Sequence, residues 1–188
     1  MTDPKGGDSI LWRRLDTPGH DACRLTQIAT GWRLDGAAVF RHDDQAARLA
    51  YRVTCDTKWH SRDGRITGWV GERAIDVTVL HFADGRWLLN GRAVAGLDGC
   101  VDLDFGFTPA TNLFQLRRVN LAVGEGADVP VAWLDVPDTT LSVLNQRYER
   151  RAEHEYWYEA PQFEYSALLE IDETGFACRY PPLWEMER

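Results

Sequence analysis

The chain has 188 residues and a mass of 21.4 kDa, which predicts one domain spanning residues 1–188. Hydrophobic residues make up 44% and charged residues 27%, a composition that excludes a disordered chain. With 21 Lys and Arg against 29 Asp and Glu, the net charge of −8 disfavours nucleic acids and anionic membrane surfaces as partners.

Residues 1–16 contain no apolar core and no small-residue cleavage site, so they lack the pattern of a secretory signal. No apolar run approaches the roughly 18 residues that a membrane helix requires. We therefore expect a cytoplasmic protein without an integral membrane segment. The cysteines lack metal-binding or redox spacing, and we expect reduced, mostly buried thiols at Cys23, Cys55, Cys100 and Cys178.

Along the chain, segments with an apolar residue at every second position are separated by turn signals. This period of two is typical of half-buried antiparallel strands and occurs in 49–55, 75–79, 101–107 and 163–171. Asx-Gly pairs favour the positive φ angles of tight hairpin turns, and they occur at Asp35-Gly36, Asp63-Gly64, Asp84-Gly85, Asn90-Gly91 and Asp98-Gly99. The pattern predicts an all-β protein.

Two segments also fit a helix. Residues 42–49 carry possible capping aspartates and predict a short helix. In 141–152, Leu141, Leu144 and Tyr148 fall on one helical stripe, but Leu144 and Tyr148 also share one face of a strand. Local propensity favours the helix in the second segment.

Asp102 and Asp104 are the best catalytic candidates, because residues two apart on a strand point the same way, about 6.8 Å apart. That spacing suits a general acid and base of the kind glycosidases use. The simpler interpretation places them on the solvent face of a strand. If they instead line an enclosed lumen, Arg117 or Arg118, expected on the next strand, would be their partners.

Other chemistries have little sequence support. A metal site formed by Cys100, Asp102 and Asp104 would mix a soft thiolate with hard carboxylates, and no histidine lies nearby, so we expect no metal. The chain has no GxSxG elbow, no Walker loop and no GxGxxG, and we expect no cofactor. His81 is expected to be a core or rim histidine. The eight tryptophans either pack the core or line a cavity for an amphiphile.

Several stretches together resemble the bacterial putative glycolipid-binding family, formerly a domain of unknown function. They are Leu97 to Asn112 with the motif GC-x-D-x-D-x-G-x-TPATN, Leu116-Arg117-Arg118, Gln146 to Arg150, Phe163 to Ile171, Gly175-Phe176 and Tyr180 to Trp184. The resemblance runs over nearly the full chain. It implies a spiral β-roll, similar to the bacterial carriers of lipoproteins, and it implies a strand over 141–150.

The expected fold is therefore all-β and antiparallel, a wrapped β-roll or open barrel that encloses a tunnel, with little helix. The expected function is non-enzymatic binding of a glycolipid or long-chain lipid in an apolar, aromatic-rich tunnel. The ligand-binding candidates are Asp102, Asp104, Asn112, Arg117 and Arg118, with Tyr148, Arg150, Tyr165 and Trp184 as secondary ones, and no residue is assigned as catalytic. The alternatives are a hydrolase that uses Asp102 and Asp104, and a scaffold whose interior its own side chains fill. The sequence leaves the oligomeric state open.

Overall fold

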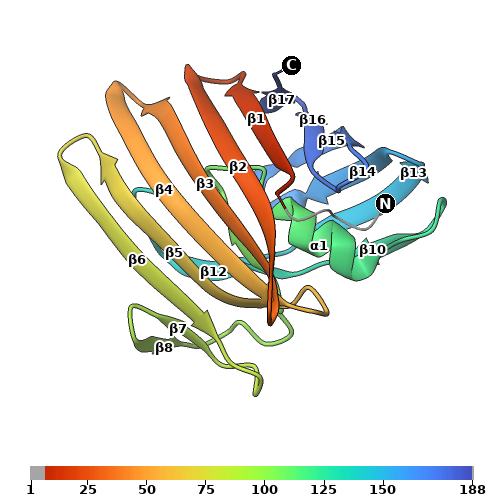
Figure 1. The fold of residues 1–188 in the computed structure, drawn as a ribbon, viewed down its shortest axis with the longest axis horizontal. Coiled ribbons are helices and arrows are strands. Elements are labelled where there is room, and N and C mark those ends of the chain that lie inside the picture. The colour runs from red at the N-terminus through yellow and green to blue at the C-terminus, as the bar shows by residue number, and fades with distance from the viewer. Residues whose placement is uncertain (1–6, 188) are drawn as a thin grey trace.

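The first half of the chain forms one wall of a large curved sheet (Figure 1). The computed structural model describes residues 7–187. In this wall the strands pair with their sequence neighbours, all antiparallel: β1 (Ser9–Arg14), β2 (Gly19–Ile28), β3 (Gly31–His42), β4 (Gln45–Asp56), β5 (Ser61–Val70), β6 (Arg73–His81), β7 (Trp87–Leu89) and β8 (Arg92–Val94).

The second half of the chain continues the same sheet on the other side of β1. Its strands are β10 (Gly126–Asp128), β13 (Arg147–Ala152), β14 (Glu155–Ala160), β15 (Tyr165–Ile171), β16 (Ala177–Tyr180) and β17 (Trp184–Met186). Strand β17 pairs with β1, with Trp12 opposite Met186 and Arg14 opposite Trp184. The sheet ends at β10 and β8, so it wraps without closing.

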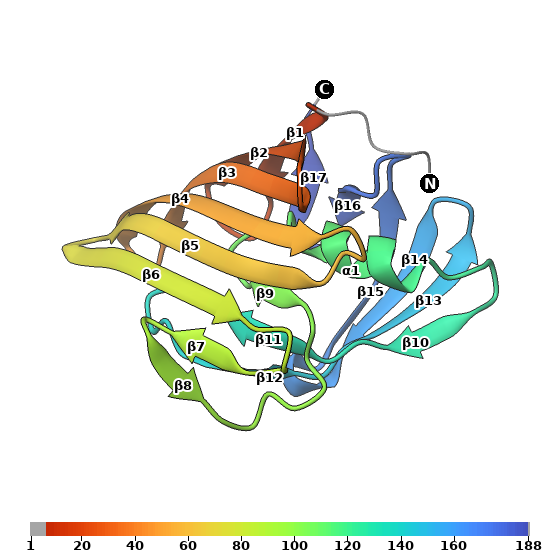
Figure 2. The same ribbon diagram turned by 60° about the horizontal axis from the view of Figure 1, so that its bottom comes forward.

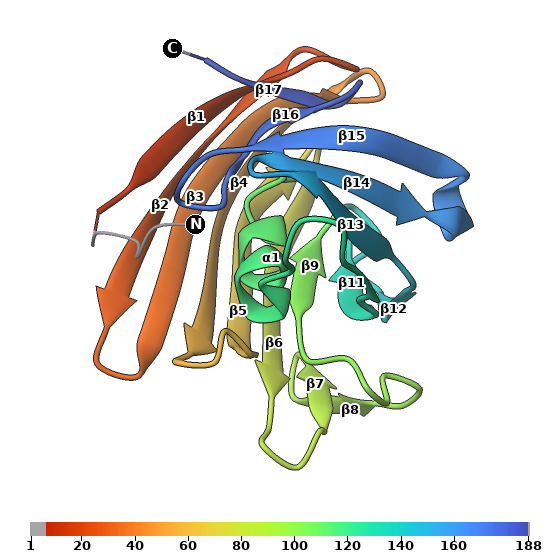
Figure 3. The ribbon, with the colours of Figure 1, turned by 90° about the vertical axis from the view of Figure 1, so that its right-hand side faces the viewer.

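A smaller layer lies inside the curve of the sheet (Figures 2 and 3). It contains β9 (Leu103–Phe105), β11 (Val131–Leu134), β12 (Leu141–Leu144) and the helix α1 (Asn112–Val119). Strand β9 pairs in parallel with β11, which pairs with β12 in antiparallel fashion. A 3₁₀ helix, η1 (Pro161–Phe163), connects β14 to β15. No helix in the described range is long and apolar enough to cross a bilayer.

The interior of the roll is occupied mainly by the protein's own side chains. Apolar residues of the large sheet, such as Trp12, Leu34 and Leu49, are fully buried together with Leu103 of β9 and Phe114 of α1. The expected fold class is confirmed: the protein is all-β, antiparallel and wrapped, with little helix. The predicted tunnel stays a prediction. The concave space in the roll is a pocket, which is described in the next subsection.

The helix predicted over 42–49 is wrong. Residues 43 and 44 form the turn of the β3–β4 hairpin, where Asp43 has a φ of 51°. Ala47 and Leu49 are buried at every second position and pair across to β3, so inward packing of a strand overrides the local preference. Over 141–150 the chain is extended as expected, but in two strands: β12 belongs to the small sheet, β13 begins in the large sheet, and residues 145 and 146 lie in neither.

Two of the predicted hairpin turns, at Asp35-Gly36 and Asp63-Gly64, are also wrong, because both pairs lie inside long strands. A Cβ atom on Gly36 would lie 2.2 Å from Cζ of Tyr51, the residue opposite it on β4. A Cβ on Gly64 would lie 2.2 Å from Cδ2 of Leu103. These glycines therefore leave room for neighbouring side chains, whereas Asn90-Gly91 does form the β7–β8 turn, with φ angles of 49° and 78°.

The packing at Gly36 predicts the effect of adding a single methyl group. We expect Gly36→Ala to lower the free energy of unfolding by about 1–3 kcal/mol, because the Tyr51 ring is held in place and cannot move aside. The control is Ala37→Val, an exposed neighbour on β3, where we expect a change of about 0.5 kcal/mol or less. Urea unfolding followed by tryptophan fluorescence measures both; equal stability of the two variants would contradict the prediction.

Candidate functional site

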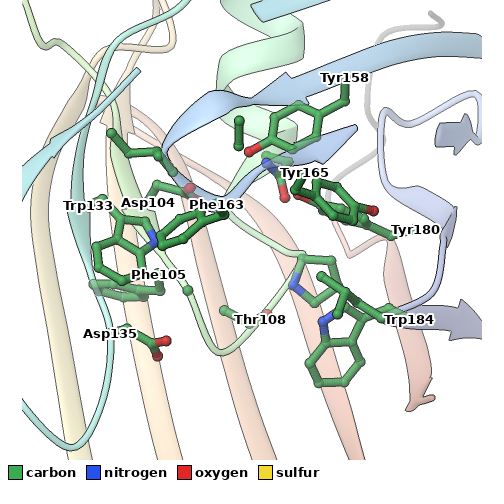
Figure 4. Close-up of a pocket in the computed structure, with 16 residues that line it drawn as sticks. Asp104, Phe105, Thr108, Trp133, Asp135, Tyr158, Phe163, Tyr165, Tyr180 and Trp184 are labelled. Carbon is green, nitrogen blue, oxygen red and sulfur yellow. The ribbon is translucent and has the colours of Figure 1, made fainter. Parts of the chain in front are cut away.

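A pocket of about 340 Å³ opens between the β14–β17 part of the large sheet, strand β11 and the segment that leads from β9 into α1 (Figure 4). These elements come from distant parts of the sequence, and the wrapping of the sheet brings them together. The residues that line the pocket are Asp104, Phe105, Gly106, Thr108, Pro109, Asn112, Trp133, Asp135, Leu144, Tyr158, Ala160, Phe163, Tyr165, Tyr180, Leu183 and Trp184.

Aromatic rings form two sides of the pocket. On one side the rings of Trp133 and Phe163 lie 5.3 Å apart between centroids. Opposite them in Figure 4, Tyr158, Tyr165 and Tyr180 form a cluster with centroid distances of 5.6 to 5.9 Å. Phe163 is 49% exposed, so it places an apolar ring at the mouth of the pocket. The arrangement can bury the apolar faces of a ligand on both sides.

Polar groups from the β9–α1 segment reach the same pocket. Asp104 is buried on β9, and Thr111 Oγ1 donates a hydrogen bond to its Oδ1 at 2.6 Å. Thr111 Oγ1 also accepts the backbone N–H of Phe105 at 3.1 Å, so it links the start of α1 to β9. Asn112 donates from Nδ2 to the hydroxyl of Tyr148 at 2.8 Å. The site thus combines an apolar enclosure with a carboxyl and an amide.

Behind Asn112 a chain of hydrogen bonds crosses the interior. Tyr148 donates to Oε1 of Gln115 at 2.8 Å, and the same oxygen accepts the amide of Gln146. Tyr158 donates to Oε1 of Gln146 at 2.7 Å. These bonds connect helix α1, the start of β13 and strand β14. The hydroxyls of Tyr148 and Tyr158 therefore already donate to protein acceptors.

Burial disfavours the charged form of the two carboxyl groups at the pocket and so raises their pKa values. Burial raises the pKa of Asp104 to about 6, and the nearby charges of Asp102 and Asp135 act in the same direction, while the Thr111 and Gln115 side chains oppose it. Burial likewise raises the pKa of Asp135, although the backbone N–H of Val136 and the positive charge of Arg14 oppose the effect. Both carboxyls line the pocket: Asp104 lies on β9, and Asp135 directly follows β11, the strand that pairs with β9.

A third buried carboxyl lies directly behind the pocket wall. Asp21 on β2 is fully buried, and its Oδ2 accepts hydrogen bonds from Thr108, which lines the pocket, and from Tyr51 at 2.9 Å. Its Oδ1 is buried without a hydrogen-bond partner in the described structure. Burial raises the pKa of Asp21 from 3.8 to about 6.

Four of the candidate residues named from sequence line this pocket: Asp104, Asn112, Tyr165 and Trp184. Tyr148 stands one hydrogen bond behind it, through Asn112. The expectation that Asp102 and Asp104 lie on a solvent face is wrong, because both are buried between the large sheet and the inner layer. Asp102 does not line the pocket.

The arginines are placed away from the pocket lining. Arg117 and Arg118 lie in the last turn of α1, not on a strand as expected, because 112–119 packs its apolar residues into the roll as a helix. Arg118 pairs with both carboxylate oxygens of Asp102, at 2.6 to 3.1 Å. Arg117 donates to the backbone oxygen of Thr174, and its guanidinium lies 5.7 Å from the Trp59 ring centroid.

Arg150, like Arg117, donates hydrogen bonds to backbone carbonyl oxygens. It donates to the carbonyl oxygens of Leu121 at 2.8 Å and Glu153 at 2.6 Å, and it lies over the ring of Tyr156. These contacts hold the segment after α1 against β13. The contacts of Arg117, Arg118 and Arg150 thus connect parts of the fold to one another. A ligand-binding role for these three arginines stays a prediction.

Sequence reasoning missed part of the aromatic lining and one carboxyl. Trp133, Asp135, Tyr158, Phe163 and Tyr180 are not among the ligand-binding candidates predicted from sequence, although they form much of the pocket. The signal was the density of aromatic residues between 156 and 184, where the strand period places Tyr156 and Tyr158 on the same inward face. Asp135 carries no such signal, because its position depends on the parallel pairing of β9 with β11.

Together the fold and the site define an open all-β roll whose interior contains an aromatic pocket with buried carboxyl groups. Over residues 9–186 the chain matches the family described as putative glycolipid-binding, and it belongs to that family. A crystal structure of a DUF1089 family protein from Pseudomonas aeruginosa is similar, with a TM-score of 0.77 over 98% of this chain and 94% of that one. At 23% identity this likeness shows the fold alone. A search of curated proteins found no match.

Removing one partner of the Asp102–Arg118 pair should destabilise the fold strongly, since Asp102 is fully buried. We expect Arg118→Ala to lower the free energy of unfolding by about 3–5 kcal/mol, because it leaves a buried carboxylate without its partner. Arg147→Ala is the control, since Arg147 pairs with the exposed Asp128 and its removal should cost about 1 kcal/mol or less. Urea denaturation compares them, and a cost at Arg118 no larger than at Arg147 would contradict this assignment.

The raised pKa of Asp21 predicts a pH dependence of stability. The folded chain keeps this proton up to about pH 6, whereas the unfolded chain releases it near 3.8, so the folded state binds more protons between these values. Raising the pH through this window therefore lowers the stability of the wild type relative to Asp21→Asn, by about 1–3 kcal/mol. Chemical denaturation of both proteins from pH 4 to 8 measures the difference. A difference that is constant with pH would show that Asp21 is not the titrating group.

Proposed function

We propose that the protein binds a glycolipid or a long-chain lipid without chemical conversion, and that the aromatic pocket is where the ligand docks. The observation that carries the proposal is the pocket itself, in which aromatic rings from β11, η1, β14, β15 and β16 surround one concave space. Apolar and aromatic enclosure with a few convergent polar groups is the usual composition of a small-molecule site. The family to which the chain belongs agrees with this class of ligand.

The size of the pocket limits how much of the ligand it holds. Its volume of about 340 Å³ is near the lower end of the range of about 300–1,000 Å³ for small-molecule sites. The pocket therefore takes one part of an amphiphile, and the rest extends past its mouth. Phe163, half exposed there, offers apolar surface to the emerging part, and burial of each methylene contributes about 0.8 kcal/mol.

The alternative of a hydrolase with Asp102 and Asp104 as acid and base has less support. Both oxygens of Asp102 are held by Arg118, and this residue is outside the pocket lining, so it has no access to a bound substrate. A general acid or base must lie within hydrogen-bond reach of the group it protonates. Non-enzymatic binding is therefore the function we propose.

Titration with octyl β-glucoside below its micelle concentration tests the proposal. We expect saturable binding by isothermal titration calorimetry, with Trp133→Ala binding about tenfold more weakly because the indole forms one side of the pocket. Trp69→Ala is the matched control, since Trp69 is 43% exposed on β5 and does not line the pocket. Absence of binding to the wild type, or an equal loss in both variants, would contradict the proposal.

A further inference from the structure

Several polar groups that line the pocket use their donors within the protein and leave acceptor oxygens unused. The hydroxyl of Tyr165 donates to the carbonyl oxygen of Pro181, and that of Tyr158 donates to Gln146. Asn112 uses its Nδ2 on Tyr148, while its Oδ1 accepts no hydrogen bond from residues 7–187. The hydroxyl protons of Tyr158 and Tyr165 and one N–H of the Asn112 amide are thus committed to protein partners, whereas the Asn112 oxygen is left as an acceptor.

Asp104 adds further acceptor capacity. An ionised carboxylate has about four acceptor positions. Thr111 donates the one hydrogen bond that a side chain of residues 7–187 makes to Asp104, and it occupies only part of that capacity. Because Asp104 lines the pocket, its remaining positions are within reach of a bound molecule. A ligand that brings hydrogen-bond donors would therefore find acceptors at the inner end.

The charge of the pocket has a single sign. Among its 16 lining residues are the carboxyls of Asp104 and Asp135, and none is Lys, Arg or His. The arginine that acts on Asp135 is Arg14, from β1. Arg14 pairs with Asp16 at 2.8 Å and lies over the Trp184 ring, outside the lining. No lining residue could pair as a cation with an anionic group placed in the pocket, and that group would lie beside the buried carboxyl of Asp104 and the half-buried carboxyl of Asp135.

The aromatic rings specify the remaining part of the ligand. Figure 4 shows Trp133 and Phe163 on one side, with Asp104 beside them, and the tyrosines on the other side. A sugar ring has apolar C–H faces that pack on aromatic rings and an edge of hydroxyl donors, so its two kinds of surface match those of the pocket. An alkyl chain would bury its carbon atoms equally well but would leave the acceptors without partners.

We propose that this pocket is the site of the glycosyl head group, and that it accepts an uncharged or amine-bearing sugar and rejects an acidic or phosphorylated one. The inference rests on the proposed function and adds where the head group lies and which charge it carries. Asp104 and Asn112 accept from the sugar hydroxyls or ammonium group. The alkyl part leaves past Phe163, and like-charge repulsion from Asp104 and Asp135 excludes anions.

Three probes that share one alkyl chain and one ring type test the charge selection: octyl β-glucoside, octyl β-glucosaminide and octyl β-glucuronide. Calorimetric titrations at pH 8 keep Asp104 ionised, since its pKa is about 6. We expect the glucoside and the glucosaminide to bind. The affinity for the glucuronide should be lower by a factor of at least about ten. Asp104→Asn keeps the side-chain size and should reduce that ratio severalfold by improving glucuronide binding.

Asp128→Asn is the matched control, because it removes one negative charge from an exposed site outside the pocket lining and should leave the ratio unchanged. Circular dichroism and thermal unfolding establish that each variant is folded, and the wild-type comparison does not depend on any variant. Equal affinity for all three probes, or a ratio that Asp104→Asn does not change, would overturn the head-group assignment while leaving lipid binding intact. If none of the probes binds the wild type, the proposed function itself fails.

Discussion

The shape of the pocket depends on the partners of two buried carboxyl groups, those of Asp102 and Asp104. Asp102 is neutralised by Arg118 from the last turn of α1, and Asp104 is held by Thr111 at the start of the same helix. A buried carboxylate without partners is strongly destabilising, so these two contacts fix the helix relative to β9 at both of its ends. With α1 fixed, Asn112 and the loop through Thr108 take their places in the pocket wall. The ion pair is thus structural, and the second carboxyl, that of Asp104, lines the pocket.

Much of the fold follows from local pattern in the sequence. The period of two correctly indicates β4, β6 and β15, because each buries one face against the inner layer. The pattern fails where a residue serves a distant neighbour. Gly36 and Gly64 follow aspartates as hairpin glycines do, yet they lie within strands and leave space for Tyr51 and Leu103. No local rule distinguishes a glycine needed for a turn from one needed for a contact with a remote side chain.

The site is harder to predict, for a related reason. The alternation of apolar and polar residues in 101–107 predicts a strand with one buried face and one solvent-exposed face, as in a protein with two layers. Here the strand lies inside the roll, so both faces are buried and Asp102 and Asp104 need internal partners. The sequence indicated an arginine for this role, and Arg118 provides it, but from a helix. Asp135 and Trp133 join the site through the β9–β11 pairing, which depends on the whole inner layer.

The contact between β1 and β17 has a consequence for how the chain folds. Because these strands are among the first and last along the sequence, and the sheet runs without interruption through their pairing, its two halves cannot be joined until the C-terminal strand exists. During synthesis the nascent β1 edge has to remain unpaired while the rest emerges from the ribosome. Non-local pairing of this kind makes folding slow and leaves an edge open to association with other chains. The molecule should therefore depend on molecular chaperones in the cell more than a helical protein of the same length.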